Sequence, residues 1–177
     1  MRYLAVAVVS ALTACRPGSR PSVTSPAARP TSSAENGVIA ILVTQVESFP
    51  YSRLNIRLTN LSGNTLAFSR PSLPWLGPYS LELAASASNG AALRLASPIA
   101  DPPASAPVEL PPGASIEGIF DLAWRVEGIE EALARGPVRV RWGYPSELPG
   151  FLQPTGIGPH IGGTIVMAPA SLNPGAG

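Results

Sequence analysis

Residues 53–60 read RLNIRLTN, a stretch in which polar and apolar residues alternate without a break. We expect Leu54, Ile56 and Leu58 to face a core and the polar residues between them to face water. A period of two with one wet face is typical of a strand in an antiparallel sheet that is covered on one side only. The stretch therefore predicts a β-strand and an antiparallel sheet around it.

Strand signals recur on both sides of this stretch. They lie at 38–46, 65–69, 79–84, 92–96, 115–122, 138–142 and 163–168. The run 38–46 is nearly continuous in apolar residues, which favours a strand that is buried on both sides for part of its length. Turn residues separate the strands, as in Ser88-Asn89-Gly90. Short strands at this spacing predict an all-β fold, a two-sheet antiparallel sandwich.

Residues 128–135 have the one helical pattern in the chain. Three apolar residues share a face at helical spacing, and Gly136 is placed to end the helix. We therefore expect one short helix near 128–135. Glu130 and Glu131 are expected on its solvated face.

The segment 110–144 combines several of these signals in one order. It runs from a strand end through the turn Pro111-Pro112-Gly113, a strand and a helical crossover to GPVRVRWGY at 136–144. This order resembles the late half of immunoglobulin-like or fibronectin-like domains of bacterial surface proteins. The resemblance implies an immunoglobulin-like sandwich without the cysteine pair of antibody domains. It bears on the fold and not on the function.

The N-terminus leads to the only cysteine in the chain. Arg2 precedes a short apolar run that ends in Leu12-Thr13-Ala14-Cys15. The run is shorter than the roughly 20 residues that span a bilayer. The arrangement resembles a bacterial lipoprotein signal peptide with its lipobox. The resemblance implies acylation of Cys15, cleavage before it, and anchoring in the cell envelope through the acyl chains. Because Arg16 follows the cysteine, it favours the outer membrane over the inner one.

These signals divide the chain into four parts. Residues 1–14 form the signal peptide, and residues 15–36 carry the acylated cysteine and a tether rich in Pro, Ser, Ala and Arg. Such a composition predicts disorder, because the tether has almost nothing to bury. The β-sandwich is expected over 37–169, and 170–177 form a flexible tail.

The charge balance excludes one class of partner. The 177-residue chain has 12 basic and 11 acidic residues, and every basic residue is arginine. Loss of Arg2 with the signal peptide leaves 11 basic against 11 acidic residues, so the mature chain is neutral. General nucleic-acid binding needs a basic surface. We therefore expect no nucleic-acid partner, and name the membrane and an envelope protein as the partners.

The sequence carries no recognisable catalytic or metal-binding set. His160 is the only histidine, and no GxSxG motif accompanies it, so we expect a loop residue rather than a general base. One histidine and a lipidated cysteine exclude the common zinc sites. The glycine pairs lack the strand and helix context of a phosphate-binding loop. We expect a protein that is not an enzyme and uses no cofactor.

Aromatic residues in proline-bounded loops are candidates for a binding surface. One loop holds Trp75 and Tyr79, and a rigid aromatic side chain there would anchor a partner. In the alternative that we favour, Trp75 folds back and plugs one end of the sandwich. A second loop at 144–151 has aromatic residues at both ends. Strand parity predicts that Trp124 and Trp142 lie in the core or at its edge.

Four arginines are expected to point outward from strands. They are Arg53, Arg57, Arg139 and Arg141. In one interpretation they form a basic stripe for an acidic glycan or a lipid head group. In the interpretation that we favour, they belong to ordinary wet strand faces and pair with acidic side chains. The acidic candidates are Glu82, Glu109 and Glu117.

The expected function is that of a membrane-anchored, non-enzymatic binding or envelope-assembly module. Two alternatives remain open. A β-sandwich protease inhibitor would present the loop 97–107 to an enzyme. A glycan-binding module would use Trp75 and the four arginines.

Overall fold

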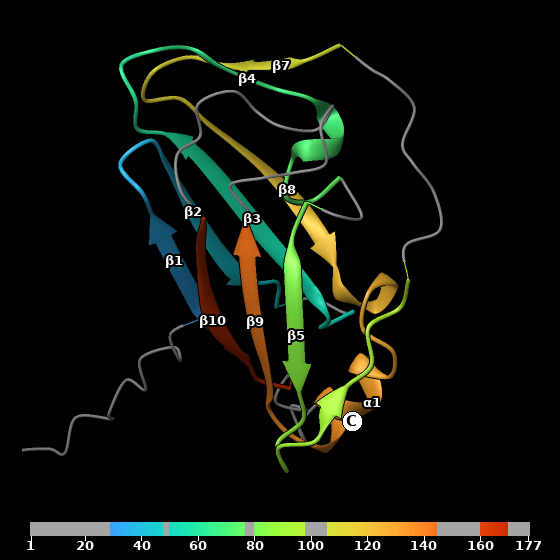
Figure 1. Cartoon of the computed structure of the whole chain (residues 1–177). Coiled ribbons are helices and arrows are strands. Elements are labelled where there is room, and N and C mark those ends of the chain that lie inside the picture. Colours follow the sequence, from blue (N-terminus) through green and yellow to red (C-terminus); the bar gives the residue numbers. More distant parts are fainter. Residues whose placement is uncertain (1–28, 48–49, 77–79, 98–105, 145–159, 170–177) are drawn as a thin grey trace, which may run out of the picture.

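Two four-stranded antiparallel sheets enclose one hydrophobic core (Figure 1). The computed structural model describes residues 29–47, 50–76, 80–97, 106–144 and 160–169. The first sheet has the order β1 (Thr31–Glu35), β2 (Ile39–Gln45), β3 (Arg53–Asn60), β8 (Ser115–Asp121). The second has the order β10 (Ile161–Met167), β9 (Val138–Tyr144), β5 (Glu82–Ser86), β6 (Ala92–Leu93). The prediction of an all-β fold with antiparallel sheets is confirmed.

The alternation in β3 has the predicted effect. Leu54, Ile56 and Leu58 are buried, and the polar residues between them lie on the outer face of the first sheet. In β2 the same face of the sheet carries Leu42, which is 36% exposed. Ala40 and Thr44 on this face are only half-buried, so the expectation that 38–46 is buried on both sides for part of its length is wrong. Within the described part of the chain, no element covers the outer face of this sheet at Leu42.

β1 corrects the predicted boundary between tether and domain. Its residues, TSSAE, were expected in the disordered tether 15–36, yet they pair with β2 from Thr31↔Thr44 to Glu35↔Ala40. The strand also lies beside β10 of the other sheet. Backbone hydrogen bonds and small inward residues hold this strand, so it shows no apolar alternation. The domain therefore begins near residue 31 rather than at 37.

A short two-stranded sheet lies at one end of the molecule (Figure 1). It pairs β4 (Leu66–Phe68) with β7 (Val108–Leu110) and runs across the top of the view, at an angle to β3 and β8. The side chain of the buried Asn60 stabilises the turn after β3 and connects it to the end of β7. Its Nδ2 donates to the backbone oxygens of Asn64 and Leu110, both at 2.8 Å. Its Oδ1 accepts from the backbone N–H of Ser62 at 2.9 Å.

The helical elements lie between strands. The 3₁₀ turns are η1 (Arg70–Ser72) and η2 (Leu122–Trp124), and the one α-helix of the described residues is α1 (Ile129–Arg135). The helix confirms the prediction for 128–135, and the Gly136 N–H closes it on the carbonyl oxygen of Ala132 at 3.1 Å.

The second sheet confirms the alternation of β9. Val138, Val140 and Trp142 are buried, and the two arginines between them are exposed. The turn Ser88-Asn89-Gly90 joins β5 to β6, with Gly90 at a φ of 83°. Such positive φ values favour glycine. The predicted bounds of the neighbouring strands shift: 79–84 becomes Glu82–Ser86, 92–96 becomes Ala92–Leu93, and 163–168 becomes Ile161–Met167.

Candidate functional site

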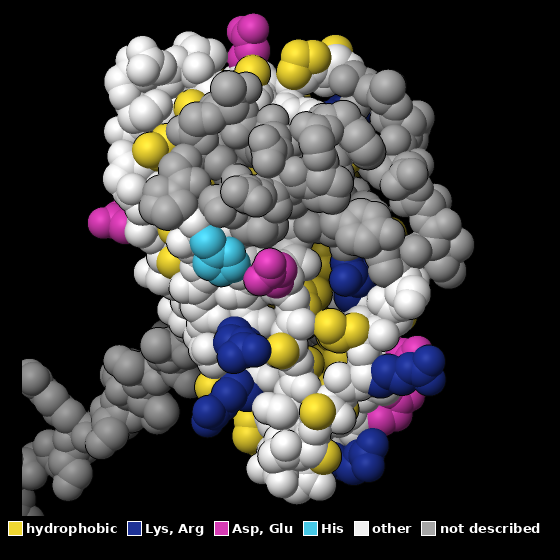
Figure 2. All heavy atoms as spheres, in the orientation of Figure 1, with side chains coloured by type: hydrophobic (Ala, Val, Ile, Leu, Met, Phe, Trp, Pro, Cys, Tyr) yellow, Lys and Arg dark blue, Asp and Glu magenta, His cyan; other side chains and the backbone are white. Residues whose placement is uncertain are grey.

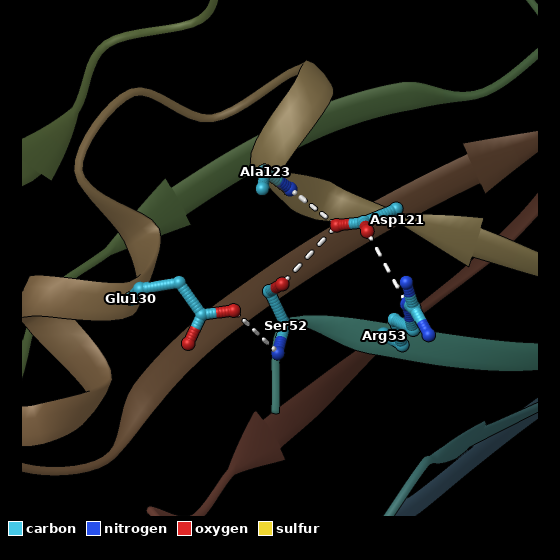
Figure 3. A network of polar contacts seen from close by, with 5 residues as sticks. All are labelled: Ser52, Arg53, Asp121, Ala123 and Glu130. Atoms are coloured by element: carbon cyan, nitrogen blue, oxygen red, sulfur yellow. Dashed lines mark hydrogen bonds and ion pairs between the residues drawn. The ribbon is translucent and has the colours of Figure 1, made fainter. Parts of the chain in front are cut away.

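Asp121 organises a polar network where β8 ends (Figure 3). Its Oδ1 accepts hydrogen bonds from the Ala123 backbone N–H at 3.0 Å and from Ser52 Oγ at 3.1 Å. Its Oδ2 accepts from Arg53 Nε at 3.3 Å. The carboxylate thus caps η2 and ties it to the start of β3. This network makes η2 a fixed turn.

Ser52 extends the network to the helix (Figure 3). The residue is fully buried, and its backbone N–H donates to Glu130 Oε1 at 3.2 Å. The expectation that Glu130 lies on a solvated helix face is therefore wrong. Its carboxylate instead supports the junction between β3 and η2.

Trp124 is the largest exposed apolar side chain among the described residues. It is 81% exposed and ends η2. The expectation that it lies in or beside the core is wrong, because the strand ends at Asp121. Leu122 takes the inward position, and the 3₁₀ turn then rotates Trp124 outward, since such a turn has about three residues and not two per repeat.

A neighbouring segment fastens the chain just after Trp124. Residues 94–96 run alongside 125–127. The Ala96 N–H donates to the Arg125 carbonyl oxygen, and the Glu127 N–H donates to that of Arg94, both at 2.9 Å. We call residues 122–127 together with 94–96 the Trp124 turn. Hydrogen bonds hold the backbone both before and after Trp124, so the indole is attached to a rigid turn.

Trp75 is half-buried and packs against the core. A methyl group added at Gly118 would clash with the Trp75 indole, so the ring lies directly over this glycine on the inner side of β8. The position agrees with the favoured alternative, in which Trp75 folds back onto the sandwich. Tyr79 lies outside the described residues.

The four candidate arginines do not form one stripe. Arg53 and Arg57 lie on β3 of the first sheet, and Arg139 and Arg141 lie on β9 of the second. Each pair points away from the shared core, so the two pairs are on opposite faces of the molecule. The basic stripe that the glycan-binding alternative requires is therefore absent.

The first pair of arginines is neutralised by carboxylates. Arg57 forms an ion pair with Glu117, as expected, and Arg53 pairs with Asp121 at 3.3 Å. A hydrogen bond from Asn55 and the Arg57 guanidinium hold the pKa of Glu117 below its usual value. The charges of these four side chains on the outer face of the first sheet therefore balance.

The outer face of the second sheet carries a shallow hollow of about 330 Å³. Glu82, Arg141, Gly143 and His160 line part of it. A methyl group at Gly143 would lie 2.7 Å from the imidazole, so His160 lies over this glycine. Figure 2 looks onto this face and shows the histidine next to an acidic side chain. The sequence did not lead us to expect this hollow. The one indication in it is that Gly143, which has no side chain, falls on an outward-facing position of β9.

Tyr144 is buried rather than placed at the exposed start of a loop. It is the last residue of β9, and its hydroxyl donates to the Ser72 carbonyl oxygen at 2.8 Å. Burial raises the pKa of this phenol above its ordinary value. Tyr144 therefore cannot serve as one of the two exposed aromatic residues of the loop predicted at 144–151. The other aromatic residue, Phe151, lies outside the described residues.

Among the described residues, no group of histidine, cysteine and acidic side chains is arranged to hold a metal ion. No helix in the same residues is long and apolar enough to cross a membrane. Cys15 and most of the loop 97–107 lie outside the described residues.

Searches against protein-family models, curated proteins and solved structures return no match for this chain. Its function must therefore be inferred from the site itself.

Proposed function

We propose that this protein is a lipid-anchored binding module of a bacterial cell envelope. Acyl chains on Cys15 hold it, and Arg16 directs it to the outer rather than the inner membrane. An immunoglobulin-like β-sandwich binds another envelope protein through the Trp124 turn. The module performs no chemistry of its own.

The observation that carries this proposal is the exposed indole of Trp124 on a fixed turn. An indole that is 81% exposed leaves a large apolar area in water, and burying that area in a partner's pocket is favourable. Tryptophan is enriched among the residues that dominate binding energy. Because Asp121 holds the turn, little conformational entropy remains to be lost on binding.

The strand arrangement supports the immunoglobulin-like part of the proposal. The first sheet takes three strands from the beginning of the chain and one, β8, from its later part, and the second sheet takes two strands from the middle and two from the end. Such interleaving is typical of sandwiches with Greek-key connections. The resemblance at 110–144 supplies the second argument.

Site-specific photocrosslinking in intact cells tests the binding surface. A photoreactive phenylalanine analogue replaces Trp124 in one variant and Leu61 in a control. Leu61 is also exposed but lies in the turn after β3, beside Asn60. We expect one discrete crosslinked protein from position 124 and none from position 61. The same products from both positions, or none from position 124, would contradict the proposal.

The crosslinked protein, once identified, allows a quantitative test. We expect Trp124→Ala to weaken its binding to the purified protein at least tenfold, because truncation of a central anchor typically costs about 2 kcal/mol or more. The thermal midpoint of the variant should match that of the wild type, since the indole is exposed. A variant that binds as tightly as the wild type would show that Trp124 is not the anchor.

A further inference from the structure

The edges of the two large sheets differ in how they are protected. β1 and β10, the end strands of the two sheets on one side, lie beside each other. At the far end of the second sheet, β6 has only two residues. At the far end of the first sheet, β8 has seven residues and, within the described ranges, no strand pairs with its outer edge. β8 is therefore the long open edge of the described fold.

The hydrogen bonds at both ends of β8 identify its free backbone groups. The Leu122 N–H donates to the Ser52 carbonyl oxygen at 3.1 Å, and the Asn60 N–H donates to that of Ala114 at 3.0 Å. In an antiparallel pair, bonded positions alternate. Even-numbered residues of β8 therefore bond to β3, and odd-numbered residues direct their N–H and C=O groups away from it. The outward-directed residues are Ser115, Glu117, Ile119 and Asp121.

This edge lacks several of the features that usually prevent pairing with another strand. Protected edges carry charged side chains, especially lysine, or proline, a bulge, an inward charge or a covering loop. β8 has no proline and no lysine, and its register with β3 is continuous from Ser115 to Asp121. Its two carboxylates are paired with arginines on β3.

Apolar side chains lie on both sides of the open edge. Ile119 is 56% exposed on the outer face, and the half-buried Trp75 lies over Gly118 on the inner face. A strand that joined β8 would cover apolar surface on each of its faces. The edge is thus built to accept an extended segment.

Two β8 strands can pair antiparallel in a register in which no like charges face each other. In an antiparallel self-pair centred on Gly118, Glu117 faces Ile119 and Ser115 faces Asp121. All seven residues take part, and outward-directed residues meet one another. A shift of the centre to residue 117 places Glu117 opposite itself, and a shift to residue 119 places it opposite Asp121. Like charges that face each other destabilise a strand pair, so the register at Gly118 is favoured.

We propose that two copies of this chain form a dimer through their β8 strands, antiparallel and centred on Gly118. The two first sheets join into one sheet of eight strands, and the interface is isologous about a two-fold axis. This dimer does not depend on the Trp124 partner. Trp124→Ala should leave it intact.

Sedimentation velocity over a concentration series tests the dimer. The mature chain from residue 15 is used with Cys15→Ser, because the apolar signal peptide and the acyl chains would both associate by themselves. We expect a reversible dimer for this protein. Ile119→Pro should give a monomer with an unchanged thermal midpoint, because the lost N–H points away from β3 and proline is tolerated at such edge positions. Ile119→Thr keeps the N–H and should remain dimeric.

Charge changes at Ser115 test the register without proline. Because Ser115 faces Asp121 of the other copy, Ser115→Arg should tighten the dimer several-fold, and Ser115→Glu should weaken it by a similar factor. Both variants lose the same hydrogen bond to Thr59, so each controls for the other. A monomer at every concentration, a dimer that a folded Ile119→Pro variant retains, or equal shifts by the two Ser115 variants would overturn the proposal.

Discussion

Tyr144 places a phenol inside the core, where its hydroxyl has one hydrogen-bond partner among the described residues. The side chain is almost fully buried, and its hydroxyl donates to the backbone oxygen of Ser72 at 2.8 Å. Burial raises the pKa of Tyr144 because a phenolate would lose its hydration there. The η1 turn is thereby attached to the end of β9 by a bond that requires a protonated tyrosine.

This bond predicts a loss of stability at high pH. Above pH 10 or so, the unfolded chain loses the Tyr144 proton while the folded protein keeps it, so the free energy of unfolding falls by about 1.4 kcal/mol per pH unit. The stabilisation is complete below the unfolded pKa. Urea unfolding at pH 8 to 11 measures it.

Tyr144→Phe provides the comparison. At pH 8 the variant should be about 1–3 kcal/mol less stable, because the Ser72 carbonyl oxygen loses its buried donor. Above pH 10 its stability should fall less steeply than that of the wild type. Parallel curves for the two proteins would show that Tyr144 does not titrate as expected.

The tryptophans show how far side-chain positions follow from the sequence. Trp142 was predicted correctly, because β9 continues as a regular strand through its position. Trp124 has the same parity as the inward residues of β8, yet the strand ends three residues earlier. The chain turns there because Asp121 caps η2 and is held by Ser52, and the contact with Ser52 is remote in sequence. Parity alone therefore placed Trp124 on the wrong side.

At the scale of elements, Gly118 and Trp75 join the loop after β4 to strand β8. The indole occupies the space that a side chain at position 118 would need. A small residue on one element thus makes room for a large one on another, as close packing of interiors requires. This contact sets the position of the loop over the sheet.

Substitution of this glycine should release the loop. We expect Gly118→Ala to destabilise the protein by about 1–3 kcal/mol, because an extra methyl group forces Trp75 or the strand to move. Tryptophan fluorescence of the folded variant should shift to the red. Gly63→Ala is the matched control, since nothing lies within 4 Å of the added methyl group there. Equal effects of the two substitutions would rule out the packing argument.

Strands with an apolar side were predictable, and the strand without one was not. β3 and β9 bury every second residue, so their sequences alternate. β1 offers only Ser32 and Ala34 on its inner side, and its stability comes from the ladder with β2 and from a 3.1 Å hydrogen bond that Trp142 Nε1 donates to Ser32 Oγ. These partners lie far away in sequence, so the composition of 31–35 indicates disorder.

At the scale of the whole molecule, the lipid anchor makes a direct prediction. Cys15→Ser should abolish incorporation of a labelled fatty acid and release the protein from the membrane fraction, because the thiol is the acylation site of the proposed lipoprotein. Fractionation with and without the substitution measures both effects. Ala14→Gly keeps a small residue before the cysteine and should remain anchored. Membrane retention of Cys15→Ser would contradict lipid anchoring at this residue.

The attachment of β1 has a mechanical consequence for a protein held by its N-terminal end. In the lipid-anchored form that we propose, a force from the membrane would enter the folded domain near Thr31, at the start of β1. The load would then fall on the contacts that hold this end of the domain, among them the ladder between β1 and β2 and the Trp142–Ser32 hydrogen bond. A pull along β1 shears all the rungs of this ladder together, whereas a pull across it opens them one by one. We therefore expect β1 to be the first strand to detach when the N-terminal segment is pulled.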